Sequence, residues 1–258
     1  MFVLRKAGSI RLSGKGYSVV KYVGSKSRIA TAIVPIIQEH IQKSGAKAYI
    51  EPFVGGANVI DKIKAEYRIG FDINGYLIAL LQYVKSGGLL PETISREQYA
   101  AIRSGMHYFP AWKVGAAGFL ASYNGKFFGG YAGKVKTKQG ERDYYDEARR
   151  NLQNQAAAFQ NIDFARLDYR NISFTDCVIY ADPPYLGTTG YSREKFDTAE
   201  FWNIIRGWSE RNIVLVSEQT APPDFKCIWA GDVKRTQDNA SRKTVTEKLF
   251  KYERGYST

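Results

Sequence analysis

The most specific chemical signal in the sequence is a carboxylate followed by two prolines and an aromatic ring, Asp182-Pro183-Pro184-Tyr185. It follows residues 177–181, an apolar run that is typical of a buried strand. Proline carries no N–H, so carbonyls at such a turn are left as acceptors. Asp182 and the Pro183 carbonyl can then accept from an exocyclic amino group, with Tyr185 stacked on the ring that bears it. We expect these four residues to be catalytic; the alternative is a proline-rich turn after a strand.

A glycine-rich turn and a later aspartate indicate a ligand site nearer the N-terminus. The apolar run 48–53 leads into EPFVGGAN at residues 51–58. Glycines let the backbone approach a ligand closely, and Asp72, about 20 positions on, suits a pair of ribose hydroxyls. The turn lacks the GxGxxG spacing, which disfavours a pyrophosphate cofactor. By themselves these features also fit a plain strand-to-helix turn and a helix cap at Asp72.

Positive charge is concentrated in three segments of the chain. Residues 1–38 contain no Asp or Glu, and basic residues gather again at 126–142 and 234–243. The formal net charge of +12 favours a polyanionic partner; a generally basic surface is the alternative. In KYVGSK at residues 21–26, Tyr22 could stack on a cofactor and Lys26 could meet a carboxylate, or the segment is a basic loop.

Together these motifs resemble the Dam-type family of DNA adenine-N6 methyltransferases, alpha group. The family pattern runs K-W/Y-x-G-x-K, E-P-F-x-G-x-G, D-I-N, a target recognition insertion and D-P-P-Y. The chain has KYVGSK, EPFVGGA, DIN at residues 72–74 and DPPY in that order. The resemblance spans residues 18–252, and the order separates it from cytosine-N4 enzymes, which often permute these motifs. It implies methyl transfer from S-adenosylmethionine to adenine N6 in duplex DNA, with the base flipped out.

The resemblance also implies a fold and a cofactor site. The fold is α/β, of the class I S-adenosylmethionine-dependent methyltransferases, with a mostly parallel seven-stranded sheet whose last strand is antiparallel. The turn reads Gly-Gly-Ala instead of Gly-x-Gly, but a small residue follows and we expect binding to persist. Asp168 and Tyr169 match by position only. The residues expected at S-adenosylmethionine are Tyr22, Lys26, Glu51, Phe53, Gly55, Gly56, Asp72, Asp168, Tyr169 and Asp182.

The same resemblance divides the chain into residues 1–87 and 160–258, the catalytic part, and residues 88–159, a small, mainly helical target recognition domain. A Tyr-Asn-Gly step at 123–125 also occurs in Dam-type enzymes that read GATC. There an arginine follows, three residues after the glycine, where this chain has Phe128. Arginine makes a bidentate guanine contact and phenylalanine cannot, so a site other than GATC is expected.

Ten residues are expected to contact DNA. Tyr123 is the candidate to fill the gap left by a flipped base, and the basic hairpin near the C-terminus resembles the family's backbone-contacting hairpin. The others are expected at phosphates or in the recognition insertion. The set is Tyr123, Asn124, Lys126, Phe128, Lys134, Lys136, Lys138, Arg235, Arg242 and Lys243.

The elements that must position these residues follow from the apolar pattern. Alternating strands and helices favour a mostly parallel sheet covered on both faces, interrupted at about 88–158 by helical or loop patterns without buried strands. Helices are predicted at 27–41, with a kink at Pro35, and at 57–66, 75–85, 143–159 and 198–211. Strands are predicted at 48–53, 67–71, 177–181 and 213–216, and at 226–229 and 247–252, joined by a basic hairpin.

Other protein classes find little support. Two cysteines do not make a disulfide framework, and two histidines at these spacings do not build a zinc cluster. No apolar run approaches the roughly 20 residues of a membrane span, and the N-terminus is a poor signal peptide. We expect a protein of the cytoplasm of a bacterial or phage-infected cell, associated with the nucleoid, monomeric or weakly dimeric, without metal or membrane.

Three rival functions stay open on sequence grounds. An RNA adenine or DNA cytosine-N4 methyltransferase is the nearest, and competition between duplex DNA and RNA would separate them. A non-catalytic nucleic-acid-binding relic of the fold is more distant, because the DPPY motif and Lys26 are intact. A nicotinamide oxidoreductase is disfavoured by the missing GxGxxG and by the basicity.

Overall fold

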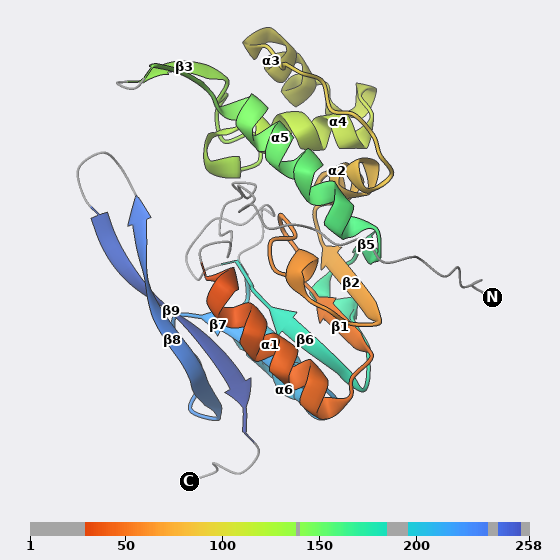
Figure 1. The fold of residues 1–258 in the computed structure, drawn as a ribbon, viewed down its shortest axis with the longest axis vertical. Coiled ribbons are helices and arrows are strands. Elements are labelled where there is room, and N and C mark those ends of the chain that lie inside the picture. The colour runs from red at the N-terminus through yellow and green to blue at the C-terminus, as the bar shows by residue number, and fades with distance from the viewer. Residues whose placement is uncertain (1–28, 138–139, 185–195, 237–241, 254–258) are drawn as a thin grey trace, which may run out of the picture.

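A seven-stranded sheet forms the centre of the computed structural model, which describes residues 29–137, 140–184, 196–236 and 242–253 (Figure 1). The side chains of Thr137, 233–236 and 242–244 are outside this description. The strand order is β5-β2-β1-β6-β7-β9-β8. The strands are β1 (Ala48–Glu51), β2 (Tyr67–Asp72), β5 (Ile162–Arg166), β6 (Cys177–Ala181), β7 (Ile213–Glu218), β8 (Phe225–Thr236) and β9 (Arg242–Tyr252).

The direction of the strands confirms the expected fold class. β5, β2, β1, β6 and β7 are paired in parallel. β9, the last strand in the chain, is antiparallel to both of its neighbours, β7 and β8. The strands at 226–229 and 247–252 were expected to be short; they extend into a long β8–β9 hairpin with an irregularity between Cys227 and Trp229.

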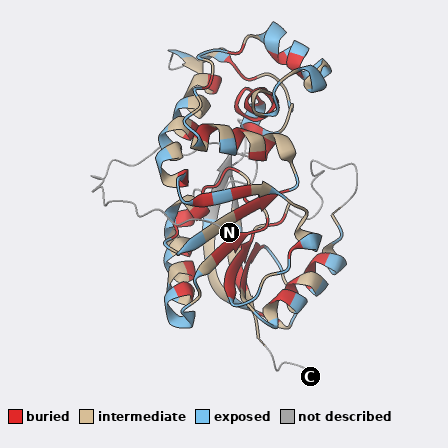
Figure 2. Ribbon diagram, turned by 90° about the vertical axis from the view of Figure 1, so that its right-hand side faces the viewer, coloured by how far each residue is buried: buried red, intermediate tan, exposed pale blue. Residues whose placement is uncertain are grey.

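Helices cover both faces of the sheet, so its strands are the most buried part of the molecule (Figure 2). Because successive strand residues point to opposite faces, β1 sends Tyr49 into one apolar cluster and Ile50 into the other. The first cluster contains α1 (Ala30–Ser44) and α2 (Gly75–Lys85), and the second contains α6 (Thr198–Ser209). Pro35 lies inside α1, which continues through it to Ser44.

The insertion between α2 and β5 stacks on one end of this layered structure (Figure 1). Its buried side chains, such as Ile102 and Leu152, belong to the same cluster as those of α1 and α2, so the core is continuous. Its main elements are α3 (Arg96–Ser104), α4 (Ala111–Gly115) with a following π-helical turn (Ala116–Leu120), β3 (Lys134–Thr137), β4 (Gly140–Asp143) and α5 (Tyr144–Gln155).

Three expectations about local structure were wrong. The β3–β4 hairpin lies where helices or loops were expected, and β5 was not predicted. The helix predicted at 57–66 is a series of turns with a short 3-10 helix (Ile60–Lys62). In these turns, carbonyls of the segment accept hydrogen bonds from side chains. Lys62 Nζ donates to the Asn58 carbonyl at 2.8 Å, and Arg68 donates to the Ile60 carbonyl at 3.2 Å.

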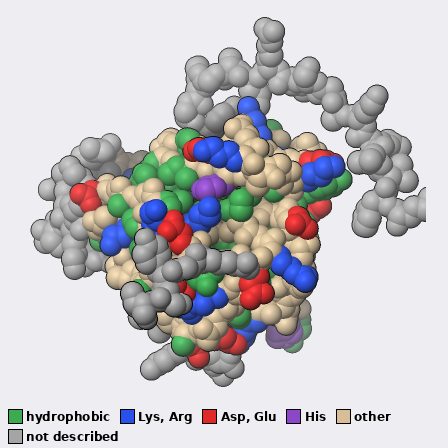
Figure 3. Space-filling model, turned by 90° about the horizontal axis from the view of Figure 1, so that it is seen from below, with side chains coloured by type: hydrophobic (Ala, Val, Ile, Leu, Met, Phe, Trp, Pro, Cys, Tyr) green, Lys and Arg blue, Asp and Glu red, His purple; other side chains and the backbone are tan. Residues whose placement is uncertain are grey.

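The end turned away from the insertion carries Lys and Arg side chains intermingled with Asp and Glu (Figure 3). Among the helices that the structure describes, none combines the length and apolarity needed to cross a membrane.

Candidate active site

Three acidic side chains come to one edge of the sheet. β1 ends at Glu51, β2 ends at Asp72, and β6 ends one residue before Asp182. The strands are parallel and in register, with Glu51 opposite Gly70 on β2, so their carboxyl ends share an edge. In open α/β sheets this edge is where ligands bind.

The turn after β1 is held against β2 by its backbone. The Val54 N–H donates to the Phe71 carbonyl at 2.7 Å, and the Gly55 N–H donates to Asp72 Oδ2 at 3.3 Å. Gly55 has φ 49° and Ala57 has φ 56°. Both lie in the left-handed region, which costs an L-residue about 1–2 kcal/mol. Ala57 stands where the family pattern has its second glycine, so the departure from the pattern carries a strain.

Asp72 is a buried acceptor at the mouth of this turn. Its side chain receives the Asn74 N–H at 2.8 Å in addition to Gly55, and the residue is only 8% exposed. Burial raises the pKa of Asp72 to about 6, against the two backbone hydrogen bonds, which lower it. The cap of α2 is Asn74, which accepts from two N–H groups of the first turn. The alternative role of Asp72 as the cap is therefore wrong.

Glu51 is buried more deeply than Asp72. It is 3% exposed and accepts a hydrogen bond from the Tyr49 hydroxyl at 2.7 Å. Burial raises the pKa of Glu51 well above its usual value; the Tyr49 hydrogen bond opposes this, and the charges of Asp61 and Asp182 add to it. Two carboxyls of this edge, Glu51 and Asp72, thus favour the neutral form more than an exposed acid does.

An aromatic group borders the turn on the side of β5. The rings of Phe53 and Tyr169 are 5.1 Å apart, and Phe196 lies 5.8 Å from Tyr169. The Leu167 N–H donates to the backbone carbonyl of Asp72 at 3.2 Å, which places this segment beside β2. The fit of a nucleoside is plain: Asp72 offers a carboxylate to hydroxyl donors, and the aromatic rings offer an apolar wall.

Asp168 is engaged by its own neighbour. Arg170 binds both carboxylate oxygens, with Nη2–Oδ2 at 2.6 Å, and this hydrogen bond lowers the pKa of Asp168. Its role beside a cofactor stays a prediction, as do those of the other expected site residues. Tyr22, Lys26 and Tyr185 lie outside the described residues.

The DPPY segment begins directly where β6 leaves the sheet. Asp182 and Pro184 are half-buried and Pro183 is buried. The prolines follow Ala181, the last residue paired with β7. Within the described part of the chain, no group of three or more His, Cys, Asp or Glu side chains could hold a metal ion.

The sequence that forms these elements matches a known family. Residues 22–228 match the family model of the D12 class N6 adenine-specific DNA methyltransferases. The chain belongs to this family.

Two curated methyltransferases are similar to the chain. The chain is 24% identical over 223 residues to "Type II methyltransferase M.FokI" of Planomicrobium okeanokoites, covering 73% of this chain and 32% of the relative. It is 25% identical over 211 residues to "Modification methylase StsI" of Streptococcus sanguinis, covering 72% and 31%. The chain thus spans about a third of the length of the curated relatives it matches.

Solved structures that match the chain over most of its length share little sequence with it. One is the rRNA methyltransferase aviRa of Streptomyces viridochromogenes, with TM-score 0.42, 13% identity and coverage of 93% of this chain and 88% of that one. Another is a putative RNA methyltransferase of Pyrococcus horikoshii, with TM-score 0.45, 9% identity and coverage of 92% of both chains.

The insertion residues expected at DNA differ in exposure. Tyr123 is 52% exposed, and Asn124, also exposed, has φ 54° in the short turn Tyr123–Gly125. Phe128 is half-buried, with its ring 5.2 Å from Tyr99 and 4.7 Å from Phe127. These contacts place Phe128 in the aromatic packing of the insertion, which leaves less of its ring for a partner than Tyr123 has.

The basic residues expected at DNA divide by their surroundings. Lys126, Lys134 and Lys136 are exposed, and Lys134 lies 3.6 Å from Glu141 across the β3–β4 hairpin. Arg235 pairs with Lys243 in the β8–β9 register, next to Arg242. The side chains of these last three residues, and Lys138 as a whole, lie outside the description. Both hairpins project to the same side of the molecule (Figure 1).

Two arginines that sequence reasoning missed line a groove on the insertion. Arg96 and Arg103 stand seven positions apart on α3, a spacing that puts both on one helix face. Arg96 lies over the Tyr131 ring at 5.0 Å. The groove has a volume of about 500 Å³ and is lined by Arg96, Tyr99, Ala100, Arg103, Ser104, Gly130 and Tyr131. The i, i+7 arginines of an amphipathic helix were the signal that could have found it.

Proposed function

We propose that the chain transfers a methyl group from S-adenosylmethionine to the N6 amino group of adenine in duplex DNA. The observation that carries this proposal is the shared edge of the sheet. There, Asp182 and Pro183 stand at the end of β6, on the same edge as Asp72 and the left-handed turn. Membership of the D12 class family supports both the reaction and the substrate.

The turn and Asp72 form the proposed cofactor site. Asp72, ionised above pH about 6, accepts hydrogen bonds from the ribose hydroxyls, and Phe53 and Tyr169 border the adenine. Gly55 and Gly56 bring the backbone close to the ligand. When bound, S-adenosylmethionine supplies an electrophilic methyl group. Glu51, at the end of β1, accepts the Tyr49 hydroxyl hydrogen bond at 2.7 Å.

Asp182 and the Pro183 carbonyl are the proposed acceptors for the target amine. Two acceptors on the two amino protons direct the nitrogen lone pair away from the ring plane. The chain thereby contributes orientation and electrostatic stabilisation, without a covalent intermediate on the protein. The adenine must leave the duplex to reach this edge, which costs a few kcal/mol. We assign Tyr185 to stacking on the flipped base and Tyr123 to filling the gap.

Residues 88–159 are the proposed target recognition domain. Tyr123 and Asn124 are exposed at one turn of it, and the groove with Arg96 and Arg103 opens beside Gly130, whose carbonyl accepts from the Tyr123 N–H. A phosphate backbone suits two arginines in a concave surface. The exposed lysines and the β8–β9 hairpin extend this basic surface on the side to which both hairpins project.

Methylation mapping tests the proposal most directly. The chain is expressed in a host whose own DNA is unmethylated, and modified bases are mapped in its genomic DNA. We expect N6-methyladenine in one sequence context other than GATC, and none with Asp182→Ala. Because the map is made from the genomic DNA of the expressing cell, it also tests whether the protein acts on DNA inside the cell. The expected monomer or weak dimer stays a prediction.

Other products would point to the rival functions. N4-methylcytosine in the map would replace adenine as the target. If the protein methylates RNA and duplex DNA does not compete, RNA is the substrate and DNA is not. If purified protein binds DNA but calorimetry finds no S-adenosylmethionine binding, the chain is a non-catalytic relic and the proposal is wrong.

A further inference from the structure

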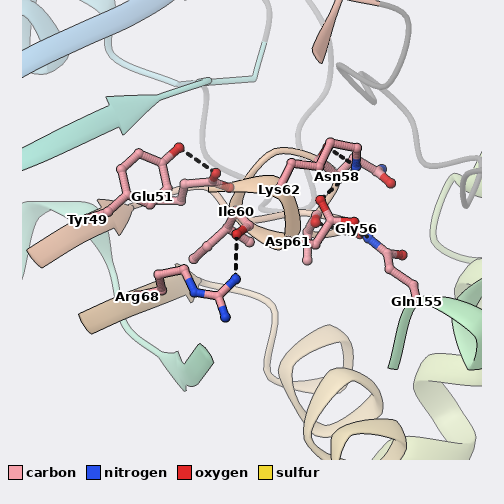
Figure 4. A network of polar contacts seen from close by, with 10 residues as sticks. Tyr49, Glu51, Gly56, Asn58, Ile60, Asp61, Lys62, Arg68 and Gln155 are labelled. Atoms are coloured by element: carbon pink, nitrogen blue, oxygen red, sulfur yellow. Dashed lines mark hydrogen bonds and ion pairs between the residues drawn. The ribbon is translucent and has the colours of Figure 1, made fainter. Parts of the chain in front are cut away.

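A glutamine of the insertion reaches the glycine turn from almost a hundred residues away. Gln155, the last residue of α5, has its side chain directed at the segment that follows β1 (Figure 4). Its Nε2 donates to the Ala57 carbonyl at 3.0 Å and to the Gly56 carbonyl at 3.4 Å. It also donates to Asp61 Oδ2 at 2.9 Å. The amide thus contacts the backbone of the turn that we assign to the cofactor. Of the side chains that we propose bind the cofactor, it contacts none that the structure describes.

The peptides that Gln155 holds include the strained position of the turn. Ala57 has φ 56° although it carries a Cβ, a conformation that glycine adopts without this cost. The other carboxylate oxygen of Asp61, Oδ1, accepts from Lys62 Nζ at 2.7 Å. Lys62 Nζ also donates to the Asn58 carbonyl at 2.8 Å. Gln155 therefore joins the left-handed residue to an ion pair that is itself anchored to the turn.

The glutamine is placed for donation. Its Nε2 meets three acceptors, whereas its Oε1 is buried and receives no hydrogen bond among the described residues. A buried acceptor without a donor is costly, and an apolar side chain of the same length would avoid that cost. Packing alone therefore does not explain an amide at this position. The hydrogen bonds to the turn and to Asp61 explain it.

We propose that Gln155 is a positioning residue for cofactor binding, which holds the Gly56–Ala57 carbonyls so that the left-handed turn keeps its shape. The inference rests on the proposed function of that turn. Because Gln155 belongs to the recognition insertion, the shape of the cofactor turn depends on how α5 docks against it. The insertion thus supports the cofactor site in addition to its proposed role at DNA.

The test compares Gln155→Met with a matched control on the same helix, Gln153→Met. Methionine keeps the length of glutamine and removes its donors. Gln153 accepts from Arg149 at 2.9 Å and lies away from these contacts to the turn. Calorimetry with S-adenosylmethionine on the full chain measures the Kd. We expect Gln155→Met to raise the Kd about tenfold, equivalent to about 1.4 kcal/mol, and Gln153→Met to leave it within twofold.

A rescue separates positioning from general support of the fold. Ala57→Gly removes the left-handed strain that Gln155 opposes, so it should restore more affinity in the Gln155→Met protein than it adds to the native chain. A purely structural loss would give additive effects of the two substitutions. Equal Kd values for the native chain and Gln155→Met, or full additivity, would overturn the proposal.

Further variants keep the test decisive if Gln155→Met does not fold. Gln155→Lys retains a donor toward the same three acceptors, and Gln155→Glu replaces the donor by an acceptor at the same length. We expect near-native affinity for the first and a larger loss for the second; the same affinity in both would refute the inference. If the native chain itself binds no S-adenosylmethionine, the proposed function fails, which is a different result from equal binding by all variants.

Discussion

The charge of Asp72 should make both the stability of the fold and the affinity for S-adenosylmethionine depend on pH. Its pKa rises from 3.8 to about 6 because burial opposes ionisation. Replacing it by Asn removes the titration at this position and leaves the other carboxyls of the chain in place. The pair of proteins therefore isolates the contribution of one buried group.

The magnitude follows from proton linkage. The unfolded chain releases this proton near pH 3.8 and the folded chain near pH 6, so the folded state holds more protons between these values. The free energy of unfolding consequently falls as pH rises through this window and is level above it. At 1.36 kcal/mol per pKa unit the total is about 3 kcal/mol.

The asparagine variant should lose this pH dependence but introduce a fixed cost. Asp72 accepts from Gly55 and Asn74 on its two different oxygens, whereas an amide offers one oxygen and a nitrogen that cannot accept. The lost acceptor costs about 1–3 kcal/mol at every pH. Asp72→Asn should therefore be the less stable protein near pH 4.5, and should match or exceed the native chain near pH 7.5.

Urea unfolding of both proteins from pH 4.5 to pH 7.5 measures this difference, and calorimetry measures S-adenosylmethionine binding over the same range. The native chain should lose affinity below about pH 6, by up to tenfold per pH unit. The Asp72→Asn variant should bind weakly without that dependence. If the difference in unfolding free energy is constant across the range, the burial argument is refuted. Equal affinities in the two proteins would refute only the contact with the ribose.

Four further substitutions, with one control, test other parts of the structure. Asp182→Ala should lower methyl transfer at least about 100-fold with an unchanged melting temperature; turnover near the native rate would remove Asp182 from the mechanism. Arg96→Ala and Arg103→Ala should each lower by about 1 the slope of the logarithm of the DNA-binding constant against the logarithm of the salt concentration. Lys43→Ala on α1 should leave this slope unchanged. If all three variants keep the native slope, the groove is not part of the DNA surface. Ala57→Gly should raise the free energy of unfolding, measured with urea, by about 1 kcal/mol. A lower free energy of unfolding in the variant would show that the left-handed turn is unstrained.

The elements with a strong apolar period could be predicted because burial alone determines them. β1, β6 and β7 lie in the centre of the sheet, and α2 and α6 pack one apolar face against it. A buried strand or an amphipathic helix displays its environment in its own residues. These elements therefore appeared close to their predicted bounds.

The wrong predictions have two different causes. Residues 57–66 have apolar side chains at helical spacing, but Gln155 and Arg68, which lie outside this segment, donate to its carbonyls, as does Lys62 within it. The β3–β4 hairpin was missed because its strands are short, polar and exposed. Neither outcome depends on a local preference that the sequence displays.

By itself the sequence determined the order along the chain of the residues proposed for the reaction: a glycine turn, an aspartate at a strand end, and a carboxylate followed by two prolines. It did so because strand ends and turns carry their own residue signals. Only the tertiary structure decided that Glu51, Asp72 and Asp182 share one edge, that burial raises the pKa of Asp72, and that Ala57 is left-handed. It alone also brought Gln155 to the turn. These features depend on contacts between segments far apart in the chain, and no local pattern records which segments meet.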